Sequence, residues 1–240
     1  WVGGQGASGF GYLVETVQQA TDGFKRLDGG GDTGYDLQDY RVKLSWETQD
    51  PGARYQRVEL KLGRTDQDSD ETYLGLTDAD FRADPVRRYA ASQLDNIDTE
   101  HEQVELRHAI EFNDALDLST TVYRHDFTRA WYKLQDVTGG SLSAILDDPE
   151  AFSEQFGWLT GQDSPNNALR IRNNNRTYEQ RGVQTVLGWA IAGDRVQHQL
   201  EFGLRRHEDE EDRFQQDDRY RMDDGVLVLT SAGAPGGQEN

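Results

Sequence analysis

The chain has 240 residues and a mass of 27.2 kDa, a length that suits one all-β domain or two small domains. Its 44 acidic and 25 basic residues give a formal charge of −19. A net anion of this size repels phosphate, which excludes a general nucleic-acid-binding protein. The chain has no cysteine, which excludes a disulfide framework, a thiolate zinc site and a cysteine nucleophile.

The apolar stretches are too short for a membrane-spanning helix. The longest, residues 186–192, is interrupted by Gly188, and a spanning helix needs roughly 20 apolar residues. The sequence contains no pattern typical of a signal peptide. It opens at Trp1 beside a glycine-rich segment, and we expect it to be a fragment or a processed piece.

Apolar and polar residues alternate along most of the chain, and a period of two indicates β-strands. A clear example is Val104 to Phe112, where apolar residues and His108 alternate with Glu105, Arg107 and Glu111. Several runs reach ten residues, which is longer than the usual globular strand of about five or six. The predicted strands lie near residues 10–14, 40–46, 58–63, 104–112, 116–123, 183–191 and 196–204.

The predicted connections alternate in length. Tight hairpin turns are expected at residues 49–53, 113–114 and 193–194, where Asp, Asn, Gly and Pro gather. The other connections are long, at about residues 22–35, 64–102, 127–177 and from 206 onward. Short turns at one end and long loops at the other are typical of outer-membrane barrels. A soluble β-sandwich with the same alternation stays an open alternative.

Aromatic residues stand near both ends of the predicted apolar band. Trp46, Phe112 and Trp189 precede the tight turns, whereas Tyr40, Tyr123 and Phe127 lie toward the long loops. Such positions are typical of residues at a membrane interface. The same residues would equally suit the core of a β-sandwich.

Short helices are expected inside the long loops. Asp84-Pro85 predicts one that runs to about Leu94, with the aspartate as N-cap and the proline in the first turn. Asp148-Pro149 predicts another, which continues to about Leu159.

Motifs for catalysis or metal binding are absent or lack the right context. Gly4, Gly6 and Gly9 have dinucleotide-binding spacing, but a predicted strand follows them in place of a helix. The acidic run from Asp66 to Asp70 lacks the glycine and glutamate of a calcium loop, and only a looser cation site stays open there. The dense acidic run His207–Arg213 is interpreted as a solvated loop. We therefore expect no enzyme, no metal and no cofactor.

Basic residues are scarce, so their clusters carry information. Guanidinium groups suit anionic ligands, and an anion site near the mouth of a pore needs such clusters. The alternative for each arginine is local pairing with the abundant carboxylates. The candidate ligand-binding residues are Arg87, Arg88, Arg129, Lys133, Arg176 and Arg181.

Several segments resemble the barrel region of TonB-dependent outer-membrane receptors, most of them within Asp66–Leu134. They are Glu71-Thr-Tyr-Leu-Gly-Leu-Thr-Asp-Ala-Asp-Phe81 with Arg88-Tyr-Ala-Ala-Ser-Gln-Leu94, then Asn113–Leu118 with Thr121–Arg124, and finally His207–Phe214 with Asp218–Met222. The nearest subfamily is that of receptors for ferric dicitrate and other ferric siderophores. The resemblance covers nearly the whole chain.

The resemblance implies an all-β fold of antiparallel up-and-down strands, with short helices in long external loops. Residues 1–240 would form part of a large transmembrane barrel of about 22 strands, without the plug domain and the remaining strands. It further implies a bacterial outer-membrane receptor that takes up ferric chelates. The implied partners are the chelate, TonB through the plug region, and outer-membrane lipid and lipopolysaccharide. A soluble all-β binding module, such as an adhesin or a carbohydrate-binding domain, is the alternative.

Overall fold

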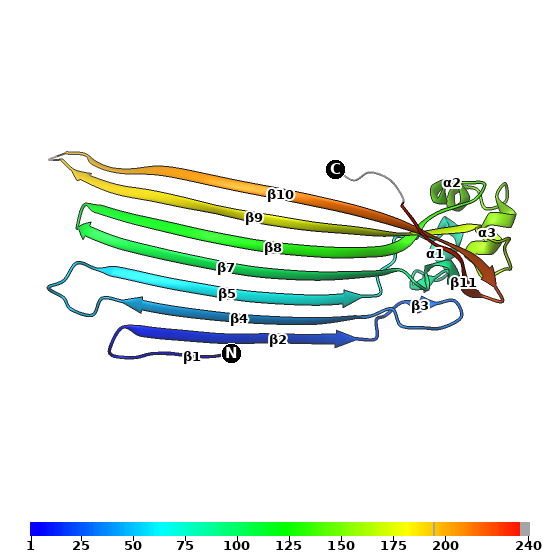
Figure 1. Cartoon of the computed structure of the whole chain (residues 1–240), viewed down its shortest axis with the longest axis horizontal. Coiled ribbons are helices and arrows are strands. Elements are labelled where there is room, and N and C mark those ends of the chain that lie inside the picture. The colour runs from blue at the N-terminus through cyan, green and yellow to red at the C-terminus, as the bar shows by residue number, and fades with distance from the viewer. Residues whose placement is uncertain (194, 236–240) are drawn as a thin grey trace.

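The computed structural model describes residues 1–193 and 195–235, and most of them belong to one antiparallel sheet (Figure 1). Within these residues nine strands pair in the order β1-β2-β4-β5-β7-β8-β9-β10-β11, so neighbours along the chain are neighbours in space. The sheet is open, with β1 and β11 at its edges. The strands are β1 (Val2–Gln5), β2 (Phe10–Thr21), β4 (Tyr35–Glu47), β5 (Gln56–Ser69), β7 (Asn96–Asn113), β8 (Leu116–Val137), β9 (Leu169–Ala192), β10 (Gln197–Asp223) and β11 (Val226–Pro235).

The remaining elements lie at one end of this sheet. Strands β3 (Arg26–Leu27) and β6 (Arg87–Arg88) form a separate parallel pair. Three short helices, α1 (Asp78–Ala83), α2 (Leu142–Asp147) and α3 (Ser153–Leu159), stand beyond the strand ends together with the 3-10 turn Ala90–Ser92 (Figure 1). This arrangement confirms the predicted fold class.

Cross-strand register keeps the apolar positions on one face of the sheet. Residues directly opposite one another in adjacent strands share a face, and the register forms apolar rows across five strands. One such row is Leu44–Leu60–Leu106–Val122–Val183. The opposite face is polar and includes Arg107, Gln184 and Glu201, as the alternation predicted.

The apolar face has no second layer over it within the described residues. Leu44 is 41% exposed and Leu106 is 46% exposed, and Val42, Leu60, Leu118, Leu187 and Leu200 are all half-buried or exposed. A β-sandwich buries the same positions between two sheets. The exposed face therefore agrees with the wall of a barrel and disagrees with the sandwich alternative.

The strands are much longer than predicted, and the long loops are correspondingly shorter. Strand β10 has 27 residues and contains the whole acidic run His207–Arg213, so the prediction of a solvated loop there was wrong. Strands β8 and β9 likewise continue to Val137 and from Leu169. The reason is that polar and apolar residues mix on both faces beyond Arg124, so alternation disappears from the sequence while the hydrogen-bonded ladder continues.

Short connections lie at one end of the sheet, as expected, with one exception. The predicted turn at 113–114 is a tight hairpin, and the one at 49–53 is an irregular connection between Glu47 and Gln56. The predicted turn at 193–194 includes Asp194, which lies outside the described residues. The exception is Asp224-Gly225, which joins β10 to β11 at the helical end with φ values of 48° and 79°. Positive φ at both central residues is the geometry of a type I′ hairpin turn.

The predicted helix from Asp84 to Leu94 was wrong. Helix α1 comes before it, capped by the side chain of Thr77, and Asp84 stands at its C-terminal end. Residues 87–88 adopt an extended conformation and pair with β3, because this pairing provides hydrogen-bond partners for their backbone N–H and C=O groups. The second predicted helix is displaced: Asp148 ends α2, its carboxylate accepts a hydrogen bond from Ala151 N, and α3 begins at Ser153.

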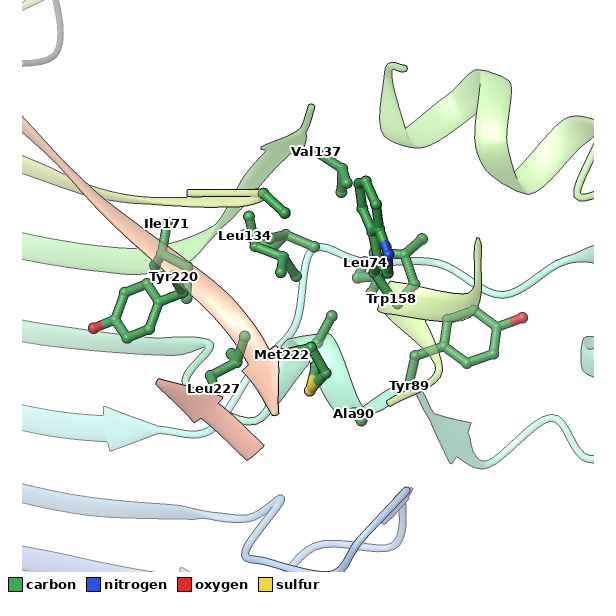
Figure 2. Close-up of a cluster of buried hydrophobic side chains, with 14 of the residues drawn as sticks. Leu74, Tyr89, Ala90, Leu134, Val137, Trp158, Ile171, Tyr220, Met222 and Leu227 are labelled. Atoms are coloured by element: carbon green, nitrogen blue, oxygen red, sulfur yellow. The ribbon is translucent and has the colours of Figure 1, made fainter. Parts of the chain in front are cut away.

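The hydrophobic core lies at the loop end of the molecule and not along the sheet (Figure 2). The loop between β5 and β7, helices α2 and α3, and the ends of β8 to β11 all contribute to it. Its most completely buried large side chains are Tyr89, Leu134, Ile145, Leu159, Leu169, Ile171 and Met222. This small folded module closes off the long connections and fixes them to the strand ends.

No helix in the described part of the chain is long and apolar enough to cross a membrane.

A glycine on the polar face makes room for the side chain beside it. A Cβ atom at Gly182 would lie 2.5 Å from the hydroxyl oxygen of Tyr123 and 2.7 Å from the carbonyl oxygen of Arg206. Tyr123 can therefore lie across β9, where its hydroxyl bonds to His207 Nδ1 at 2.8 Å and accepts from Arg205 Nη2 at 2.8 Å. This polar contact ties β8 to β10 across the strand between them.

Gly182→Ala should lower the free energy of unfolding by about 1–3 kcal/mol, because the added methyl group overpacks this contact. The matched control is Gly203→Ala in β10, where an added Cβ meets nothing within 4 Å. The control should be neutral or stabilising by about 0.5–1 kcal/mol. Urea denaturation followed by tryptophan fluorescence checks both, and equal effects would contradict the packing role of Gly182.

Candidate anion-binding site

Three arginines stand side by side on the polar face of the sheet. Arg176 in β9 is directly opposite Arg129 in β8 on one side and Arg213 in β10 on the other. Directly opposite residues have Cβ atoms about 4.5–5.5 Å apart, and like charges at that spacing are destabilising. We call Arg129, Arg176 and Arg213 the arginine row.

The carboxylates around the arginine row neutralise it only in part. Arg176 Nη1 donates to Glu211 Oε1 at 2.7 Å and to the hydroxyl of Tyr178 at 3.1 Å. Arg129 forms no ion pair or hydrogen bond through its guanidinium with any residue of 1–193 or 195–235, and its Nε is buried without a partner. The Nε of Arg176 is also buried and unpartnered among these residues. A buried donor without an acceptor is costly. Both side chains are half-buried, so an external acceptor can approach their terminal guanidinium nitrogens and not the buried Nε atoms.

Lys133 extends the positive charge toward the helical end. Its Nζ lies 3.4 Å from the ring centroid of Tyr73 and 4.0 Å from that of Trp131, and the two rings meet edge to face. Burial lowers the pKa of Lys133, and neighbouring Arg129 lowers it further. The two rings stabilise the ammonium group through cation–π contacts and hold it beside the arginine row.

A buried carboxylate fixes the loop that carries Tyr73. Leu134 N donates to Asp95 Oδ1 at 2.7 Å, and the hydroxyl of Thr72 donates to Asp95 Oδ2 at 2.8 Å. The same hydroxyl accepts from Leu74 N at 3.0 Å. Burial raises the pKa of Asp95 to about 6 despite these hydrogen bonds. The position of Tyr73 over Lys133 therefore depends on Asp95.

Nearby, Arg172 belongs to the structural framework. Its Nε and Nη2 donate to the two oxygens of Asp217 at 2.6 and 2.9 Å, and Arg170 also pairs with Asp217. Burial favours the neutral form of Asp217, but the hydrogen bonds and charges of Arg172 and Arg170 together outweigh burial and hold the pKa of Asp217 below the usual value. This pair neutralises itself, and within the arginine row Arg129 remains without an ion-pair partner among residues 1–193 and 195–235.

Of the six residues predicted as ligand contacts, the structure brings three together: Arg129, Lys133 and Arg176 lie on one face of β8 and β9. Arg87 pairs with Asp28 at 2.8 Å and Asp80 at 3.2 Å, which ties two loops together. Arg88 is 4% exposed and donates to the carbonyl oxygens of Ser92 and Asp70. Arg181 points to the opposite face of β9, where it pairs with Glu179 and Glu208.

Sequence reasoning missed Arg213 and Tyr73. Arg213 was hidden because the acidic run was interpreted as a loop, and a two-residue period continued through that run would have aligned it with Arg176. Tyr73 reaches the site through a loop, and no sequence pattern predicts that contact. Tyr123 and Phe127, both expected toward a membrane interface, lie instead on the polar face, where Phe127 stands beside Tyr178.

Metal binding finds no support in the described part of the chain, where no group of three or more His, Asp or Glu residues is arranged to hold an ion. Asp66, part of the looser cation site that the sequence left open, pairs with Arg64 at 2.9 Å.

Comparison with known proteins identifies similar solved structures. No protein-family model and no curated protein matches the sequence. The ferric citrate transporter FecA, in its unliganded form, matches 99% of this chain with a TM-score of 0.58 and 16% identity. The closed form of the ferric-catecholate import receptor Fiu from E. coli K12 matches 98% with a TM-score of 0.56 and 10% identity.

These matches confirm the fold of the barrel region expected from the resemblance to TonB-dependent receptors. The chain spans only 28% of FecA and 32% of Fiu, so it corresponds to a part of those proteins. FecA is a transporter and Fiu is an import receptor.

Asp95→Asn should change how stability depends on pH. The pKa of Asp95 rises from an ordinary 3.8 to about 6 on folding, so the folded state binds more protons between these values. Stability is then lost as pH rises from about 4 to about 6, by roughly 3 kcal/mol at most. The variant has no titrating group at this position, so it should not lose this part of its stability. Its unfolding free energy should therefore rise relative to that of the wild type as the pH increases from about 4 to about 6. Parallel pH profiles of the two proteins would contradict a buried, proton-binding Asp95.

Proposed function

We propose that this chain is part of the barrel wall of a bacterial outer-membrane receptor that takes up anionic ferric chelates. The observation that carries the proposal is the arginine row, in which Arg129 lacks an ion-pair partner within the described residues. The function is transport and not catalysis. The plug and the remaining strands would come from other parts of the receptor.

The dimensions of the apolar face support a position in the membrane. On β7 the outward apolar positions run from Val104 to Phe112, which is nine residues, and a barrel strand needs about 9–11 to cross. Beyond Val104 the same face becomes charged, with Arg64 pairing with Glu100 and Glu102. The charged part of this face would meet the headgroups of lipid and lipopolysaccharide.

The height of the arginine row supports a role in ligand capture. Arg129 lies five residues beyond Arg124, which marks the upper end of the apolar band on β8. At about 3.3 Å per residue, the row stands roughly 16 Å outside the band along the strand. The row would therefore line the vestibule on the external side, where a chelate arrives first.

Charge explains why the vestibule needs such a row. The chain carries a charge of −19, so its overall field repels an anion. Screening weakens that repulsion beyond about 8–10 Å at physiological salt, and a local group of guanidinium forks then decides binding. An anionic chelate would accept hydrogen bonds from Arg129 and Arg176, with Lys133 adding charge, and would relieve the repulsion between the arginines.

The solved neighbours support the class of cargo. FecA is a ferric citrate transporter and Fiu is a ferric-catecholate receptor, and both cargoes are anionic iron complexes. By analogy, TonB would supply energy through the plug region of the complete receptor. Arg87, Arg88 and Arg181 are not proposed as contacts, because their guanidinium groups already bind carboxylates or carbonyl oxygens.

Arg129→Gln combined with Arg176→Gln should weaken chelate binding by at least tenfold. Each charge-assisted hydrogen bond contributes about 1.5–3 kcal/mol, and 1.4 kcal/mol corresponds to a factor of ten. The measurement is the affinity of the full-length receptor for ferric citrate and for a ferric catecholate across salt concentrations. The double variant should also show a weaker dependence on salt.

Arg124→Gln combined with Arg181→Gln is a matched control. These two residues are also directly opposite one another in β8 and β9, but they lie on the other face of the sheet. The control removes the same number of charges from the same two strands. Because these arginines lie on the other face and their exposed ion pairs contribute little, chelate affinity should stay within about twofold of wild type. An equal loss in both variants would mean that net charge, and not a site at the arginine row, governs binding.

A further inference from the structure

A hollow lined by aromatic rings lies directly beneath the arginine row. It has a volume of about 420 Å³ and is lined by His101, His125, Phe127, Tyr178 and Gln180. These residues come from β7, β8 and β9 and share the polar face of the sheet with the arginines. Phe127 and Tyr178 each stand two residues from the arginine of their own strand, about 7 Å along it.

The walls of the hollow consist of π-systems and one amide. His101 and His125 stack at 5.6 Å with an interplanar angle of 26°, and Phe127 and Tyr178 lie 5.8 Å apart at 32°. His101 also meets Phe127 edge to face at 6.2 Å. Among the residues that the structure describes, no carboxylate lines the hollow. Flat aromatic surfaces at these angles are suited to a planar ring, which can stack on one wall and meet another by its edge.

The two sites are connected through Tyr178. Its hydroxyl accepts a hydrogen bond from Arg176 Nη1 at 3.1 Å, which holds the ring of the hollow against the arginine row. Arg129 and Arg176 stand directly opposite one another on the same face, two residues closer to the helical end of β8 and β9, and Arg129 has no guanidinium partner among the described residues. An occupant that satisfies both features carries anionic oxygens next to an aromatic ring.

We propose that the hollow is a subsite for an aromatic ring of the chelate, whose ring-bound oxygens face Arg129 and Arg176. This inference rests on the proposed function and specifies its cargo. The preferred chelate is then an aryl one, such as a catecholate or a phenolate. An aliphatic hydroxycarboxylate such as citrate would fill the arginine row and leave the hollow without a partner.

The test compares two chelates on the purified full-length receptor. Affinities for ferric 2,3-dihydroxybenzoate and for ferric citrate are measured by titration calorimetry. Phe127→Leu combined with Tyr178→Leu keeps apolar bulk in the hollow but removes both π faces. This variant should bind the aryl chelate about tenfold more weakly and ferric citrate within about twofold of wild type. The matched control Tyr178→Phe keeps the ring and removes only the hydroxyl that accepts from Arg176, so it should weaken the binding of both chelates slightly and alike and leave the ratio of their affinities near that of wild type.

Each other outcome overturns the inference. Equal losses for both chelates would mean that the rings only support the arginine row. Unchanged binding with a lower melting temperature would mean that the hollow receives a side chain of the receptor itself. The arginine double variant separates this inference from the proposed function. If the arginine double variant binds both chelates with wild-type affinity, the proposed arginine site is wrong. If the arginine variant loses affinity but the leucine variant keeps wild-type affinity for both chelates, only the aryl subsite is wrong.

Discussion

Continuous pairing of backbone hydrogen bonds between neighbouring strands is the constraint on which the rest of the structure depends. Strand β10 pairs with β9 over 24 consecutive positions without a register shift, and β9 pairs with β8 along nearly its whole length. A fixed register means that side chains keep to one face from one end of a strand to the other. The same alternation of side chains along each strand can therefore place apolar residues on one face of the sheet in one part of the strands and the arginine row on the other face further along.

The same register explains the cost and the use of the arginine row. A one-residue slip of β9 would move Arg176 to the other face and bring Arg181 to the polar one. Instead, Arg129, Arg176 and Arg213 are held against one another, and the repulsion is balanced in part by Glu211. Strain of this kind, maintained by a rigid ladder, is suited to a site that an anionic ligand completes.

The folded module at the loop end gives the site its second side. Its buried core fixes the segment around Tyr73, and Asp95 attaches that segment to the backbone of Leu134 in β8. Lys133 is thereby held between two rings beside the arginines. Without this module Lys133 would be a mobile surface lysine, and the charge at the mouth of the sheet would be less localised.

The sequence predicts the sheet well wherever one face is apolar. The seven predicted strands are all present, because alternation is a direct consequence of facing two different environments. Prediction from alternation fails beyond Arg124 and Leu204, where neither face stays uniformly apolar and the strands nonetheless continue. The predicted helix after Asp84 failed for another reason: a tertiary pairing with β3 overrides the local capping signal. Arg129, Lys133 and Arg176 were found as charges, but Arg213 and Tyr73 become visible only through register and loop packing.

The central claim is that the two faces of this sheet meet different solvents, and spin labelling tests it most directly. Nitroxide labels are placed one at a time at positions 118 to 131 of β8 in the receptor embedded in outer membrane, and their collision rates with oxygen and with a water-soluble nickel chelate are measured. The account predicts high oxygen accessibility at positions 118, 120 and 122, low values at the positions between them, and loss of the difference beyond Arg124. Labels at 118, 120 and 122 that are shielded from both reagents would show a second protein layer on that face and would contradict the account.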